Sequence, residues 1–315
     1  MTFKNYIMIK FKKFEGLVAA PFTPMDKNGN LNTGLIPEYY DFLAANGVIG
    51  AFINGSTGEG PSLTQKERRL QAEQWASCMK NDGRMRIINM IGGPSHRECI
   101  ENAVFSYEAG LSAVAMVAPY YFKPSGPEAL AEFVAIVGES VPDMPVYFYN
   151  IPVFTGVRIP MIEFLKKITN MLPNFVGLKY TDEDLMDFMS CINYRNGAYD
   201  MLYGRDECML AVLALGCKGF VGSTYNYAAP LYHSLIKAFN KGDLKEAGKL
   251  QQKSIDMIDL LGKYGGMATG KAYMNLAGLD CGKFRPPVHN MADDQFNAFK
   301  EDVRMLGIDH LFAKR

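Results

Sequence analysis

Eight short apolar runs alternate with helical patterns over the first 240 residues of this 315-residue chain. Each run is bounded by glycine, proline or small polar residues, as buried strands are. The runs cover residues 16–20, 48–54, 86–92, 112–118, 144–150, 174–180, 200–204 and 218–223. Helices between successive strands indicate a parallel sheet, and eight strand–helix units are the number that closes a barrel. The pattern therefore predicts an α/β fold, a (β/α)₈ TIM barrel.

Residues typical of helix ends fall between these runs. Gly47 and Gly110 each follow a helical pattern, where a glycine can adopt the left-handed conformation that ends a helix. Two helices are expected to begin with capping boxes, formed by Thr64 with Glu67 and by Ser95 with Glu98. These signals place the helix boundaries close to the ends of the apolar runs.

The helical pattern continues without strands after residue 230. We interpret this region as the last barrel helix followed by a helical C-terminal extension packed on the barrel. The predicted organisation is a poorly ordered basic leader over 1–13, the barrel over 14–240 and the extension over 241–315. A doubly wound sheet is the alternative fold, but it usually carries a glycine-rich nucleotide turn after its first strand. The first run here ends in AAPFTP instead.

Composition narrows the possible partners. The chain has 33 Lys+Arg and 33 Asp+Glu and no basic block, which argues against nucleic acid. No apolar run approaches the roughly 18 residues of a membrane helix, and the broken N-terminal pattern is a poor signal peptide. The six cysteines form no C-x-x-C pair and the four histidines are scattered, so a zinc site is not expected. This cysteine usage indicates a reducing compartment, and we expect a cytoplasmic protein.

Lys179 ends the sixth apolar run, in the sequence NFVGLKYT. A lysine is seldom fully buried without a partner or a function, and burial favours its neutral amine. A neutral amine is a nucleophile that forms a Schiff base with a ketone. A lysine at a strand end can also reach into water along its aliphatic stem. Taken alone, this stretch favours a lysine that reaches into solvent. The residues at the other strand ends decide whether Lys179 belongs to a catalytic site.

Catalytic groups of such barrels lie at the C-terminal ends of the strands. Ser56 and Thr57 follow the second run and offer donors to a carboxylate, although glycine and serine also dominate plain turns. Tyr149 ends the fifth run, where it can move a proton or pack. Asp206 and Glu207 follow the seventh run and suit either a helix start or sugar hydroxyls. With the lysine, these residues predict a site for a ketone substrate.

Over nearly its whole length the sequence closely resembles the dihydrodipicolinate synthase and N-acetylneuraminate lyase family of Schiff-base aldolases. The matching motifs are APFTP (20–24), GSTGE (55–59), PYYFKP (119–124), YNIP (149–152), GLKYT (177–181), GRDE (204–207) and GSTYN (222–226). The resemblance implies a (β/α)₈ barrel, no metal or other cofactor, and a homotetramer. It implies that Lys179 forms the Schiff base with pyruvate and that Tyr149 transfers the proton. Ser56 and Thr57 match residues that hold the pyruvate carboxylate, and Tyr121 matches a tyrosine that reaches in from a neighbouring subunit.

YNIP, KYT, the G-x-D-E turn (204–207) and GSTYN are similar to the N-acetylneuraminate lyases of this family. That similarity implies a set of residues that hold the polyhydroxy tail of the sugar acid: Thr181, Gly204, Asp206, Glu207 and Ser223. Arg205 departs from the pattern, because these lyases usually carry an apolar residue there. Phe154 stands where dihydrodipicolinate synthases carry an arginine for a second carboxylate, a pairing that phenylalanine cannot make.

The predicted activity is cleavage of N-acetylneuraminate to pyruvate and N-acetylmannosamine, with small-molecule partners and no cofactor. Two alternatives stay open at the level of sequence. One is another pyruvate-dependent aldolase of the family, such as dihydrodipicolinate synthase or 2-keto-3-deoxygluconate aldolase. The other is a non-catalytic sugar-acid sensor. Lys179 and Tyr149 together favour an enzyme, because binding alone needs no imine.

Overall fold

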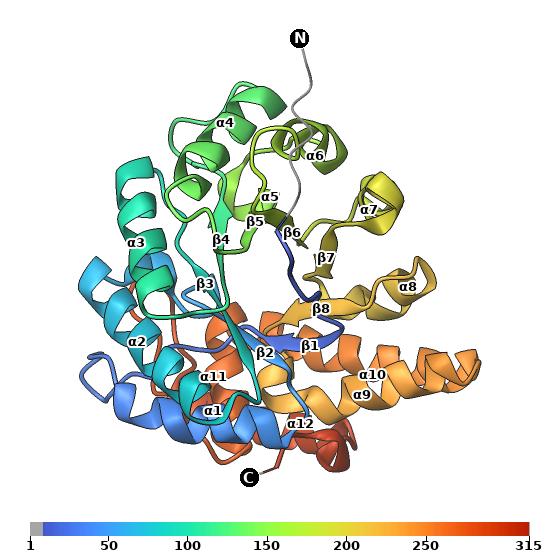
Figure 1. Cartoon of the computed structure of the whole chain (residues 1–315). Helices are drawn as coiled ribbons and strands as arrows, with labels where there is room; N and C mark the ends of the chain where they lie inside the picture. Colours follow the sequence, from blue (N-terminus) through green and yellow to red (C-terminus); the bar gives the residue numbers. More distant parts are fainter. Residues whose placement is uncertain (1–8, 315) are drawn as a thin grey trace.

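The computed structural model describes residues 9–314, which include a closed barrel of parallel strands in sequence order. The predicted TIM barrel is therefore confirmed. Figure 1 shows the strands at the centre and the helices around them. The strands are β1 (Gly16–Ala19), β2 (Gly50–Ile53), β3 (Arg86–Met90), β4 (Ala113–Val117), β5 (Val146–Asn150), β6 (Phe175–Tyr180), β7 (Asp200–Tyr203) and β8 (Gly219–Gly222).

Two apolar layers follow from the alternation of side chains along each strand. In β4, Ala113, Ala115 and Val117 belong to the cluster inside the barrel. Val114 and Met116 belong to the larger cluster between the strands and the surrounding helices. Because both faces of every strand are covered, the strands are apolar almost throughout, which explains why the apolar runs were readable in the sequence.

β6 departs from this alternation. Phe175 and Gly177 pair with adjacent residues of β5, so Val176 is an extra residue that makes a β-bulge. A Cβ atom at Gly177 would lie 2.0 Å from the carbonyl oxygen of Asp200, so this close approach requires glycine. Bulges re-aim the side chains that follow them. Here the bulge turns Lys179 toward the barrel interior.

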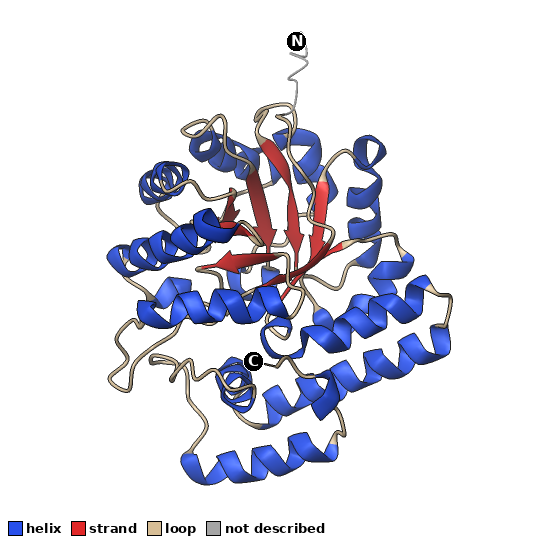
Figure 2. Cartoon of the chain, turned by 60° about the horizontal axis from the view of Figure 1, so that its bottom comes forward, coloured by secondary structure: helices blue, strands red, loops and turns tan. Residues whose placement is uncertain are grey.

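The helices surround the barrel as Figure 2 shows. The barrel helices are α1 (Ile36–Ala45), α2 (Gln65–Asp82), α3 (His96–Glu108), α4 (Pro127–Gly138), α6 (Met161–Ile168), α7 (Leu185–Asn193), α8 (Met209–Ala214) and α9 (Tyr225–Asn240), with the short α5 (Pro152–Thr155) after β5. Thr64 and Glu67 form the predicted capping box. At α3 the Ser95 side chain accepts from the Glu98 backbone N–H, while the return bond of a capping box is not among the hydrogen bonds of the described residues.

The C-terminal extension consists of α10 (Leu244–Lys263), α11 (Thr269–Leu276) and α12 (Asp293–Met305). Figure 1 shows these orange-to-red helices gathered against the same side of the barrel as α1 and α9. Residues 1–8 of the predicted leader lie outside the described residues. Its last part is tied to the barrel, because Lys13 Nζ donates to the Tyr199 carbonyl oxygen at 2.9 Å. No described helix combines the length and apolar character needed to cross a membrane.

Candidate active site

A cavity of about 170 Å³ lies at the C-terminal ends of the strands. Its lining includes most of the side chains predicted from sequence: Thr57, Tyr149, Lys179, Gly204, Asp206, Glu207 and Ser223. These residues come from the ends of β2, β5, β6, β7 and β8 or from the loops that follow them. Barrel closure therefore brings together residues that are far apart in the chain, as the strand-end principle predicts.

Lys179 is buried at the end of β6, with its amine over two aromatic rings. Its Nζ lies 3.9 Å from the ring centroid of Tyr149 and 4.2 Å from that of Phe52. Burial lowers the pKa of Lys179 to about 7, and the nearby carboxylate of Asp206 opposes that shift. Close to neutral pH, a large fraction of this lysine is a free amine, which is the nucleophilic form.

Tyr149 is the β5 neighbour of Lys179, since the two residues are directly paired in the barrel register. Burial raises the pKa of Tyr149 to about 12, and the nearby hydroxyls of Ser56 and Thr181 partly oppose the shift. The phenol therefore stays protonated at neutral pH. Ser56 and Thr181 accordingly lie beside the hydroxyl of Tyr149, next to the cavity that holds the other predicted residues.

Asp206 supplies a buried carboxylate near the lysine, just after the neighbouring strand β7. Its Oδ2 accepts from the Thr224 hydroxyl at 2.5 Å and from the Thr224 backbone N–H at 3.2 Å. Its Oδ1 is buried and makes no well-formed hydrogen bond among residues 9–314, although the Tyr225 hydroxyl lies close enough to lower the pKa of Asp206. Burial raises the pKa of Asp206 to about 6, and Glu207 adds to the shift while Thr224 opposes it. The free oxygen is an acceptor that a bound donor can satisfy.

Two glycines make room for these polar groups. A Cβ at Gly222 would lie 1.9 Å from Asp206 Oδ1, and a Cβ at Gly204 would lie 2.0 Å from Thr181 Oγ1. Thr181 Oγ1 is also buried, and it makes no hydrogen bond with good geometry to the rest of the described chain. Asp206 Oδ1 and Thr181 Oγ1 are therefore two buried oxygens of the site that lack a well-formed hydrogen bond within residues 9–314, and a polar ligand can supply it.

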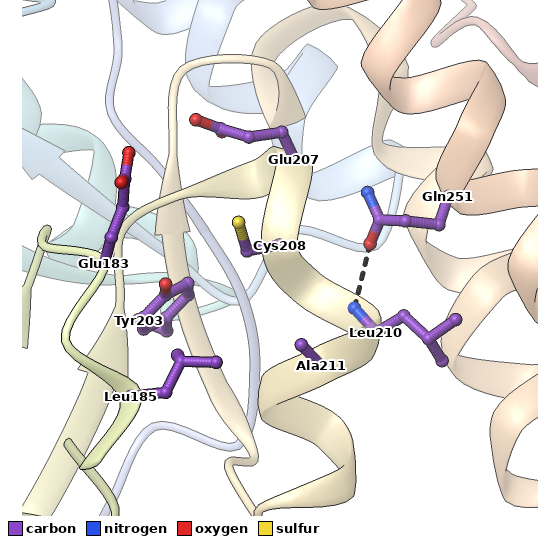
Figure 3. A pocket seen from close by; sticks show the side chains of 8 residues that line it. All are labelled: Glu183, Leu185, Tyr203, Glu207, Cys208, Leu210, Ala211 and Gln251. Atoms are coloured by element: carbon purple, nitrogen blue, oxygen red, sulfur yellow. Dashed lines mark hydrogen bonds between the residues drawn. The ribbon is translucent and has the colours of Figure 1, made fainter.

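Arg205 does not pair with Asp206. Its guanidinium lies 2.9 Å from Glu207 and 2.9 Å from Glu183, and so bridges the loops that follow β7 and β6. Figure 3 shows the Glu207 side chain extending toward Glu183 at the rim of a second, largely apolar pocket of about 460 Å³. The departure from the family pattern therefore engages Glu207 at the mouth, while the Asp206 carboxylate is held by Thr224.

Ser56, Thr181 and Tyr121 are the predicted site residues that do not line the cavity; Ser56 and Thr181 lie beside Tyr149, whereas Tyr121 lies apart. It is 77% exposed on the loop after β4, with its ring 5.1 Å from that of Phe122. Phe154, on α5, is also exposed. The expectation that Tyr121 reaches a neighbouring subunit's site stays a prediction.

Sequence reasoning missed the residues that support the site from the extension. Ile258 and Leu261 of α10 line the cavity, and Gln251 of the same helix donates to the Asp206 carbonyl oxygen at 3.3 Å. Thr224, which holds Asp206, was visible only as part of the eighth strand end. Periodicity identifies α10 as amphipathic without showing which strand end its apolar face meets.

Among the described residues, no group of three or more His, Cys, Asp and Glu side chains is placed to hold a metal ion.

Comparisons with known proteins bear on the family and the fold. Residues 13–306 match the model of the dihydrodipicolinate synthetase family. The N-acetylneuraminate lyase of Mus musculus is 38% identical over 304 residues, which cover 95% of this chain and 94% of the mouse protein. The structure of the Proteus mirabilis N-acetylneuraminate lyase has a TM-score of 0.90 at 35% identity, with 94% and 99% of the two chains covered. A dihydrodipicolinate synthase of Bacillus anthracis has a TM-score of 0.87 at 27% identity, with 93% and 99% covered.

Proposed function

Because this chain belongs to the dihydrodipicolinate synthetase family, we propose that it is a Schiff-base aldolase whose reaction is the cleavage of N-acetylneuraminate to pyruvate and N-acetylmannosamine. Relatives named for that activity are 35–39% identical over most of both chains. The single structural observation that carries the proposal is the burial of the Lys179 amine in a cavity that it shares with the Asp206 carboxylate.

The reaction begins at Lys179. Its neutral amine attacks the C2 ketone of the open-chain sugar acid, and loss of water gives a protonated imine. The bond between C3 and C4 then breaks as the C4 hydroxyl loses its proton, and the electron pair passes into the imine to form an enamine. N-acetylmannosamine leaves, a proton returns to C3, and water releases pyruvate from the lysine. The covalent route divides one difficult cleavage into easier steps.

Tyr149 is the proton-transfer group in this proposal. Since its phenol is protonated at neutral pH, it cannot simply take the C4 proton. It must pass its own proton onward while accepting that of the substrate, and Ser56 and Thr181 are the hydroxyls near enough to influence it. The tyrosine therefore acts as a relay in place of a free base.

Substrate choice follows from what the site offers beyond the lysine. Thr57 and Ser56 are the proposed donors to the carboxylate of the substrate. Asp206, Thr181, Gly204, Ser223 and Glu207 are the proposed contacts of the hydroxyl-bearing tail. A second carboxylate, as dihydrodipicolinate synthases bind, would face Asp206 and Glu207 without an arginine at position 154. The site favours a polyol tail over a second anion.

The proposal includes a homotetramer in the cytoplasm. Three aromatic residues are exposed, Tyr121 and Phe122 on the loop after β4 and Phe154 on α5, which fits burial by another copy of the chain. The six cysteines are all free thiols, which fits a reducing compartment.

A substrate panel tests the activity. N-acetylneuraminate, 2-keto-3-deoxygluconate, and pyruvate with aspartate semialdehyde are supplied in turn, and kcat/KM is compared. We expect cleavage of N-acetylneuraminate to give the highest value. A higher value for the semialdehyde condensation would identify the protein as a synthase and would leave the role of Lys179 intact.

A further inference from the structure

A buried ion pair joins the second strand end to the C-terminal extension. Glu59, the last residue of the GSTGE turn, lies 2.8 Å from Lys271 Nζ of α11, and the two side chains are 2% and 3% exposed. The Arg285 backbone N–H donates to the other oxygen of Glu59 at 2.9 Å. Lys271 also donates to the Lys283 carbonyl oxygen at 3.1 Å. Both oxygens of one carboxylate are therefore bonded to the extension.

The turn that carries Glu59 also carries Ser56 and Thr57. The Glu59 backbone N–H donates to the Ser56 carbonyl oxygen at 3.1 Å, which closes the turn over the two hydroxyl residues. Glu59 has a φ of 55°, a left-handed conformation that is uncommon for a residue with a side chain. The Thr23 hydroxyl, from the loop after β1, donates to the Gly58 carbonyl oxygen at 2.5 Å. A strained turn of this kind needs the surrounding structure to hold it.

The extension is itself anchored at this point. Arg285 Nε donates to the Gly29 carbonyl oxygen at 2.9 Å, and its Nη1 donates to Glu67 of α2 at 3.0 Å. The segment around Arg285 is thereby fixed to two other elements, so Lys271 and Arg285 offer Glu59 a rigid partner.

Stability alone is a weak reason for such a pair. The attraction between two buried charges is largely cancelled by the loss of their hydration, although removal of one partner leaves a costly lone charge. Burial lowers the pKa of Lys271, and Glu59 opposes that shift. The pair does fix the position of the two side chains, because their polar atoms have hydrogen-bond partners in only one arrangement.

We propose that Glu59 and Lys271 are positioning residues, which hold the turn so that Ser56 and Thr57 meet the carboxylate of the keto acid bound at Lys179. Neither residue lines the active-site cavity, so both act through the turn. The inference rests on the proposed pyruvate chemistry and does not depend on which sugar acid is cleaved. It gives the C-terminal extension a part in the reaction besides covering the barrel.

The test measures pyruvate binding by borohydride trapping of the imine. In Lys271→Met, and in the double variant Glu59→Gln with Lys271→Met, the pyruvate concentration that gives half-maximal trapping should rise about tenfold or more, because misplaced binding groups are costly. Maximal trapping at saturating pyruvate should persist, since Lys179 is untouched. Amide exchange over residues 55–62 should become faster. The double variant leaves no lone buried charge, so it keeps the test valid if the single variant folds poorly.

Lys283→Met is the matched control. Its side chain makes a 3.4 Å ion pair with the exposed Asp293, so half-maximal trapping should stay at the wild-type value. The proposal is overturned if the folded double variant has wild-type half-saturation together with a lower melting temperature, since the pair would then serve stability alone. A wild-type protein that traps no pyruvate would refute the proposed function itself, and the two failures are therefore distinguishable.

Discussion

At the scale of single residues, the chemistry depends on the Lys179 amine. Because burial lowers its pKa to about 7, the rate of imine trapping with pyruvate should rise with pH and level off above about 7. The rate rises with pH because only the neutral amine reacts. Each pH unit below the pKa lowers the neutral fraction about tenfold. Asp206→Asn removes the charge that opposes the shift, so its pH profile should move to lower pH. A wild-type profile that rises up to pH 10 would show an ordinary exposed lysine.

Asp206 also bears on substrate choice. Replacing it by alanine should lower kcat/KM for N-acetylneuraminate by roughly 1–3 kcal/mol of transition-state stabilisation, because substrate hydroxyls lose a buried acceptor. Trapping with pyruvate should change less, since pyruvate has no tail. Equal losses in the two assays would indicate that Asp206 serves Lys179 and not the tail.

At the scale of elements, β6 illustrates where sequence reasoning stops. The apolar run and the lysine at its end were both predicted, but the bulge at Val176 was not. A bulge depends on the register between two strands, and the register is set by partners about 30 residues away. Gly177 was the available signal, since a glycine inside a strand suggests a bulge or a close approach of another backbone.

Gly177→Ala tests the role of the bulge. The added methyl would meet the Asp200 carbonyl oxygen, so we expect a loss of roughly 1–3 kcal/mol in unfolding free energy and weaker trapping at Lys179. Gly248→Ala in α10 is the matched control, because a Cβ there meets nothing within 4 Å. The control should be neutral or stabilise the fold slightly. Equal behaviour of the two variants, measured by thermal unfolding, would contradict this account of β6.

At the scale of the whole molecule, the barrel followed from repetition of one pattern, and the site followed from strand ends converging at one mouth. The contributions of α10 and of Lys271 could not be predicted, because the local sequence of the extension does not show where on the barrel it packs. The same holds for contacts between copies of the chain.

We expect light scattering to give about four times the 35.1 kDa of one chain. We also expect Tyr121→Ser to impair cleavage of N-acetylneuraminate; a fully active monomer would contradict the tetramer prediction.

The most direct test of the central claim is to supply N-acetylneuraminate with borohydride and to map the modified peptide by mass spectrometry. We predict release of N-acetylmannosamine and a pyruvate-derived mass on the peptide that holds Lys179. Lys179→Ala should abolish both. A label on another residue, or cleavage that persists in Lys179→Ala, would contradict the account.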